Sequence, residues 1–212
     1  MSASITVDIA CITIALLITV IYNGILMFMI RKHPSTVRHA MNQAARRAWT
    51  LDVMRTNRDI LAVQTLRNGM MAATLLASTS LTLASLVAAY LYKVGEDSGA
   101  WSLPDDTPIG HVNPVIKLFI LLCLFMTSFF AFMQSLRSAS TASFLIGIRA
   151  DQPECNPDRV ADIVQWSALF YSFGTRAFVL SFVLLLWIFS APAALAGSVI
   201  VNAVYVFNDF VH

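Results

Sequence analysis

Four arginines are the residues of this chain whose type and position could do chemistry. Each lies at or just inside one end of a different uncharged stretch, and they are Arg31, Arg67, Arg137 and Arg176. An arginine at such a position usually extends to the lipid headgroups, and this explanation suffices for Arg31. The other three have amide or hydroxyl neighbours along the chain, and ionisable groups at membrane depth usually face the interior of a bundle.

Guanidinium and amide donors that meet at one end of a helix bundle would suit an anion, a phosphate or a lipid headgroup. The candidate set for such a site is Arg67, Arg137, Arg176, Gln64, Asn68 and Gln134. The alternative is a buried polar network that locks the helix ends, with Asp59 or Asp162 as the counter-charge. The sequence leaves both interpretations open.

Motifs of catalytic and metal sites are missing from the sequence. His33 and His39 are six residues apart, which does not place two imidazoles on one helix face. Cys11, Cys123 and Cys155 form no C-x-x-C pair, so thiols predict neither a zinc site nor a redox motif. We expect no enzyme, no cofactor and no metal. The basic segment is flanked by apolar stretches, so we expect no nucleic-acid partner either.

The composition identifies the environment in which these residues lie. The chain has 212 residues, of which 58% are hydrophobic and 12% are charged, and its mean hydropathy is +0.70. Soluble domains carry about 25% charged residues, so this chain has too little charge to cover a water-facing surface. We predict an all-α, polytopic transmembrane helical bundle that forms a single membrane domain over residues 1–212.

Uncharged stretches define the predicted elements, because about 20 apolar residues cross a bilayer as a helix. We predict four spans and a terminal fifth segment, over residues 8–30, 68–92, 115–136, 167–190 and 193–208. The last uncharged stretch, 177–208, is too long for one upright span, and Pro192 interrupts it. One long kinked span and two separate segments are both compatible with it, and we favour two segments.

The distribution of charge predicts the orientation. Segment 31–67 carries eight basic residues against two acidic ones, whereas the segment after the second span is mainly acidic. The positive-inside rule therefore places segment 31–67 in the cytosol and the N-terminus outside, in a bacterial inner membrane. Residues 36–66 are predicted to form a cytosolic amphipathic helix that continues into the second span and contacts anionic lipid or another subunit.

Small residues recur at helical spacing in the second predicted span, at Ala73, Ala77, Ser80, Ala84 and Ala88. They predict close helix packing, since small side chains let membrane helices approach one another. Further hydroxyls in the same span come from Thr74, Ser78, Thr82 and Ser85. They could bond carbonyls of their own helix or line a polar path, and both interpretations stay open.

Three blocks of this sequence resemble the uncharacterised membrane family called domain of unknown function 599. The blocks are residues 42–49 with 60–79, residues 134–137 with 142–146, and residues 173–178 with 186–189. The resemblance implies a multi-pass membrane protein and supplies no substrate or mechanism. It also suggests that Gln64, Arg67, Asn68, Arg137 and Arg176 belong to the family pattern.

These observations lead to two functional hypotheses. The first is a homo-oligomeric channel or transporter whose arginine-rich inner mouth attracts anions or phosphate-bearing solutes. The alternative is an accessory or scaffold subunit, without transport activity, that binds lipid or another membrane protein. Proton coupling has little support, because Asp8 and Asp209 lie at the ends of apolar stretches.

Overall fold

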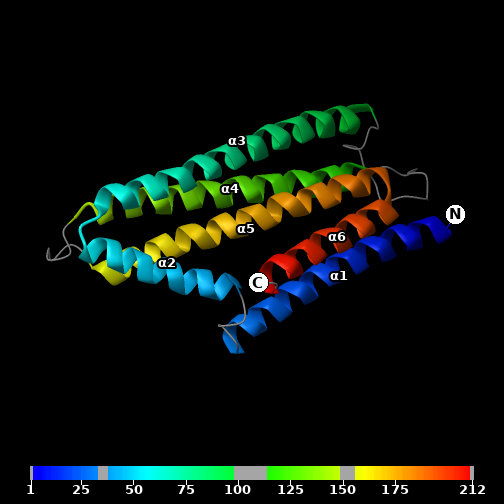
Figure 1. Cartoon of the computed structure of the whole chain (residues 1–212). Helices are drawn as coiled ribbons and strands as arrows, with labels where there is room; N and C mark the ends of the chain where they lie inside the picture. Colours follow the sequence, from blue (N-terminus) through cyan, green and yellow to red (C-terminus); the bar gives the residue numbers. More distant parts are fainter. Residues whose placement is uncertain (1, 33–37, 98–113, 149–155, 211–212) are drawn as a thin grey trace.

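The computed structural model describes residues 2–32, 38–97, 114–148 and 156–210. These residues form an all-α structure, as predicted. Its helices are α1 (Ser2–Lys32), α2 (Arg38–Arg55), α3 (Asp59–Asp97), α4 (Pro114–Ile146), α5 (Pro157–Phe189) and α6 (Ala191–Phe210) (Figure 1). The side chain of Arg31 and the whole of Cys155 lie outside the described part.

Five of these helices, all except α2, are long and apolar enough to cross a membrane. The chain is therefore a multi-pass helical membrane protein, and the exact number of spans stays a prediction. Helix α3 has 39 residues, or about 58 Å at 1.5 Å per residue, against about 30 Å of hydrocarbon. Helices α3, α4 and α5 thus extend beyond a bilayer, and α2 lies beside them at one end, called the α2 end below (Figure 1).

The prediction of one cytosolic helix over 36–66 is wrong in one respect, because the helix is interrupted between α2 and α3. Asn57 adopts a left-handed conformation with φ of 51°, which asparagine tolerates better than most residues. The N–H of Arg58 donates to the carbonyl of Val53 at 3.1 Å, closing the end of α2. From Asp59 onward the helix does continue into the second apolar stretch, as predicted.

The break also divides the apolar side of the predicted amphipathic helix between α2 and α3. Val53 and Met54 of α2 are buried against Ile146 and Val160, whereas Ile60 and Leu61 of α3 are exposed. Helix α2 therefore packs on α5 and the end of α4. Its amphipathic contact with a bilayer stays a prediction.

Helices α3, α4 and α5 form one group through small side chains. Ala73, Ala77, Ser80 and Ala84 are buried, which confirms the packing role predicted for them, and Ala88 is half-buried. Ser135 and Ser167 each donate a hydroxyl to the carbonyl of the other, at 2.9 and 3.0 Å. Ser128 donates to the carbonyl of Gly174 at 3.0 Å. These bonds fix α4 and α5 as antiparallel neighbours.

Four hydroxyl side chains of the second apolar stretch lie on the exposed side of α3. Each donates to a carbonyl of its own helix, and they belong to Thr74, Ser78, Thr82 and Ser85. All four residues are exposed in the isolated chain. They therefore line no polar path within the described residues of one chain.

Helices α1 and α6 form a second, parallel pair. Ser198 donates to the carbonyl of Ala15 at 3.2 Å, and Asn202 donates to the hydroxyl of Thr19 at 3.2 Å. Between α5 and α6 the chain reverses at Ser190, which has an extended backbone. Pro192 lies in the first turn of α6, where a missing N–H is tolerated. The favoured arrangement of two separate segments is confirmed.

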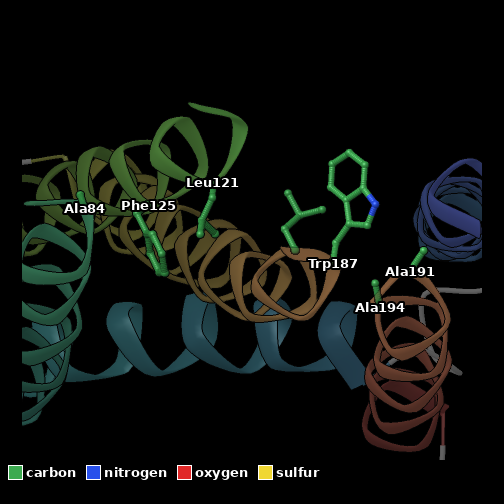
Figure 2. Close-up of a cluster of buried hydrophobic side chains, with 7 residues drawn as sticks. Ala84, Leu121, Phe125, Trp187, Ala191 and Ala194 are labelled. Atoms are coloured by element: carbon green, nitrogen blue, oxygen red, sulfur yellow. The ribbon is translucent and has the colours of Figure 1, made fainter. Parts of the chain in front are cut away.

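One buried cluster joins the two groups of helices (Figure 2). It contains Leu121 and Phe125 of α4, Trp187 of α5, and Ala191 and Ala194 of α6. Half-buried Cys11 and Ile12 of α1 pack against it. The contact lies at the end of the bundle opposite α2, so the groups are joined there by apolar packing (Figure 1).

Candidate functional site

Arg176 of α5 connects the two helix groups through polar contacts. Its Nη2 lies 3.0 Å from Oδ2 of Asp209 in α6, and its Nη1 donates to Oδ1 of Asn23 in α1 at 2.8 Å. Tyr22 donates its hydroxyl to the same Asp209 carboxylate. The guanidinium also lies over the ring of Tyr205, 5.2 Å from its centroid. Three helices thus meet at one charge pair.

This pair lies within the apolar depth of the bundle. Asn23 is seven residues before the end of the apolar stretch Ile9–Ile30, so it lies about 10 Å inside that end. The side chains of Arg176 and Asp209 are 26% and 16% exposed. An unpaired arginine at the centre of a membrane helix costs about 2.5–3.5 kcal/mol on insertion scales. Contacts with Asp209, with Asn23 and with the rings of Tyr22 and Tyr205 offset that cost.

A cleft of about 260 Å³ borders the pair, between α1, α4, α5 and α6. Its lining is mostly apolar, with polar groups from Arg176, Asn23, Asn202 and Tyr205 among others. Asn202 is only 7% exposed. Its Oδ1 and the hydroxyl of Tyr205 are buried without a hydrogen-bond partner among the described residues. Such groups normally have partners, so these two atoms, both in residues that line the cleft, leave hydrogen bonds unmade.

The structure does not bring the three predicted arginines together. Arg137 follows Ser135, which faces Ser167, and Arg176 lies beyond Gly174, which faces Ser128. In this antiparallel register Arg137 and Arg176 differ in depth by about 16 Å. Arg67 lies near the start of α3, at the α2 end. Only Arg176 lies at the cleft described above.

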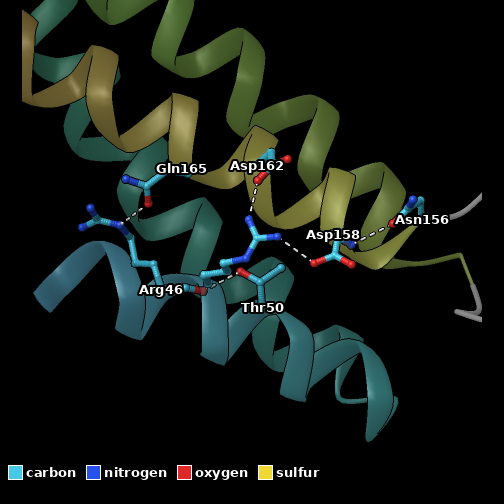
Figure 3. A network of polar contacts seen from close by, with 7 residues as sticks. Arg46, Thr50, Asn156, Asp158, Asp162 and Gln165 are labelled. Atoms are coloured by element: carbon cyan, nitrogen blue, oxygen red, sulfur yellow. Dashed lines mark hydrogen bonds and ion pairs between the residues drawn. The ribbon is translucent and has the colours of Figure 1, made fainter. Parts of the chain in front are cut away.

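The remaining predicted site residues point away from the bundle interior. They are exposed, and their side chains have no hydrogen bond or ion pair to any other described residue: Gln64, Arg67, Asn68, Gln134 and Arg137. The predicted counter-charge Asp162 binds Arg47 instead, together with Asp158 (Figure 3). The arginine cluster is therefore not formed within one chain. A role for these residues in anion binding stays a prediction.

Asp209, Asn202 and Tyr22 are the site residues that sequence reasoning missed. Asp209 was expected at the end of an apolar stretch, yet it is the partner of the deepest arginine. One signal was present, since Asn202, Tyr205 and Asp209 follow each other at spacings of three and four residues. That spacing places polar groups on one face of a helix.

Comparison with known protein families gives a match over nearly the whole sequence. The model of the family described as "Protein of unknown function, DUF599" matches residues 10–212. No curated protein and no solved structure gives a significant match. The site must therefore be interpreted from its own chemistry.

Proposed function

This chain belongs to the DUF599 family, and for it we propose a transporter that binds a small organic anion in the cleft beside Arg176. The observation that carries the proposal is the cleft itself. A charged pair and two polar atoms without a partner among the described residues lie at membrane depth, where two groups of helices meet. A guanidinium binds a carboxylate in a planar, two-bonded geometry, which fits this class of solute.

The proposed binding step is an exchange of carboxylates. A solute carboxylate replaces that of Asp209 on Arg176, while Asn202 Oδ1 and the Tyr205 hydroxyl bond the polar groups of the solute. Release of Asp209 breaks the contact between α5 and α6 at this depth. The pair α1–α6 can then separate from α3–α5 while the apolar cluster around Trp187 serves as the hinge. Binding would thereby be linked to opening of the cleft.

We place the α2 end in the cytosol and the N-terminus outside, in a bacterial inner membrane. The excess of basic residues in segment 31–67 supports this orientation. The exposed Arg67 and Arg137 then lie on the cytosolic side, where they would attract anions toward the protein. This is the part of the predicted arginine-rich mouth that the proposal keeps.

The proposal is tested first with the full chain in detergent and then in liposomes. Acetate, lactate, succinate and inorganic phosphate are compared by thermal unfolding, and uptake of the most stabilising anion is measured. A ligand at 100 times its Kd stabilises the folded state by about 2.7 kcal/mol. Stabilisation by one organic anion, with saturable uptake, supports the proposal. Absence of both for the whole panel overturns it.

The rival scaffold function is favoured by one observation, which is that Arg176 has its partners within the chain. Tyr205→Phe separates the two functions, because the hydroxyl that it removes has no partner among the described residues. A structural lock would lose no bond and keep its stability. A solute site would lose a hydrogen bond, so anion affinity should fall by about fivefold. Tyr90→Phe, on exposed α3, is the matched control.

A further inference from the structure

A second cleft lies at the α2 end and shares no residue with the Arg176 site. Its volume is about 350 Å³, and it lies between α2, α3, α4 and α5. Arg46, Thr65, Tyr171 and Ser172 supply polar groups to its lining. Nothing in the proposed transport mechanism uses this cleft, so its role is independent of that mechanism.

Arg46 carries a charge that no carboxylate of the described residues neutralises. Its side-chain partner is a neutral group, Oε1 of Gln165, which lies 3.4 Å from its Nε. The two terminal nitrogens of its guanidinium have no acceptor among the described residues. Figure 3 shows this guanidinium pointing away from Asp158 and Asp162. Burial lowers the pKa of Arg46, which reflects the loss of water around its charge.

The neighbouring Arg47 shows the opposite arrangement. It is exposed and binds Asp158 and Asp162 together, and the hydrogen bond to Asp162 raises the pKa of Arg47. The two carboxylates at this end of α5 are therefore already bound. Arg46 is left as a partly desolvated cation without a carboxylate partner among the described residues.

Gln165 adds a further hydrogen-bond donor beside Arg46, and Ser172, about two helical turns further along α5, adds another to the cleft. The side-chain nitrogen of Gln165 is buried and has no partner in the described residues. Ser172 lines the cleft with a hydroxyl that bonds no other described group. A group that accepts several hydrogen bonds and carries negative charge fits these donors, and phosphate is the group of that kind found at membrane surfaces.

The depth and the remaining lining distinguish a lipid from a free anion. Gln165 lies two residues before the predicted span 167–190, which is the level of lipid phosphates rather than of acyl chains. Leu66, Met70, Leu136 and Ala139 provide apolar surface in the same cleft. We propose that the cleft binds an anionic phospholipid, whose phosphate contacts Arg46 and Gln165 and whose acyl chain begins along α3 and α4.

The proposal is tested by native mass spectrometry of the full chain in detergent. Phosphatidic acid, diacylglycerol with the same acyl chains, and inorganic phosphate serve as probes. Phosphatidic acid should bind, diacylglycerol should not, and inorganic phosphate should not displace the lipid. Arg46→Gln should lower the affinity for phosphatidic acid by about tenfold, as expected for one charge-assisted contact.

Arg47→Gln is the matched control, since it removes the same charge from the adjacent residue. It should change the affinity by less than about twofold, because Arg47 already has two carboxylate partners. Equal losses for both variants would mean unspecific attraction and would overturn the proposal. Equal binding of diacylglycerol, or displacement of the lipid by inorganic phosphate, would overturn it as well.

Ser172→Ala is the second test variant, for the case that Arg46→Gln fails to fold. The side chain of Ser172 makes no hydrogen bond to another described residue, so its loss should not affect folding. It should leave the unfolding temperature unchanged and lower the affinity for phosphatidic acid by about threefold. Unchanged affinity for this variant, together with a destabilised Arg46→Gln, would refute a phosphate site in this cleft.

Discussion

Arg176 and Asp209 each depend on the other, because neither charge has a second ionic partner among the described residues. Asp209→Asn should destabilise the folded state by up to about 3 kcal/mol, since loss of one partner leaves a cation uncompensated at membrane depth. In a chain of this size that corresponds to a fall of up to roughly 6–12 °C in unfolding temperature. Thermal unfolding in detergent measures it.

The double variant Arg176→Gln with Asp209→Asn is the control at the same residues. It removes both charges and keeps two polar side chains of similar size. Stability should recover most of the loss seen for Asp209→Asn alone. An additive loss in the double variant would show that the two charges do not act as a pair.

Gly174 and Gly197 lie at two helix contacts that differ in how easily the neighbouring side chain could make room for a Cβ. A Cβ at Gly174 would lie 3.0 Å from the ring of Phe132 and 3.2 Å from the Cβ of Ala131. Phe132 is fully buried between α4 and α5, so it has little freedom to move. Overpacking costs about 1–3 kcal/mol, which exceeds the gain of about 1 kcal/mol from alanine in a helix. Gly174→Ala should therefore lower stability, as thermal unfolding would show.

Gly197→Ala is the contrasting variant in α6. Its Cβ would lie 2.8 Å from Cδ1 of Leu186, which is even closer. Leu186 is 40% exposed, however, and the end of its side chain can turn aside. The helix propensity of alanine then offsets the contact, and stability should change by less than about 0.5 kcal/mol. A larger loss at Gly197 than at Gly174 would contradict this ranking.

At the scale of elements, the sequence predicts most of the helices. A long apolar stretch in lipid must satisfy its backbone hydrogen bonds internally, and an α-helix does so within the stretch itself. Pro192 likewise predicts where α5 and α6 separate. The turn at Asn57 was missed, since no glycine or proline marks it. The contacts of Arg176 with Asn23 and Asp209 join residues far apart along the chain. Such pairings depend on how helices pack, which one sequence without relatives does not reveal.

The whole molecule presents an exposed face on α3 that is unusual for lipid contact. Along one side, small and hydroxyl residues recur at spacings of three and four, at Ser78, Thr82, Ser85 and Ala89. Their backbone can approach another helix closely, which is how membrane helices associate. The predicted homo-oligomer would therefore form through α3 of two copies.

Cysteine cross-linking in the membrane tests this arrangement. In a chain whose native cysteines are replaced by serine, Thr82→Cys should give a cross-linked dimer under mild oxidation. Leu81→Cys is the matched control, because Leu81 is also exposed but lies one residue away, on another side of α3. The two α3 helices would lie about 8–10 Å apart, which brings only the facing thiols into bonding range. Equal cross-linking of both variants, or of neither, would exclude an α3 interface.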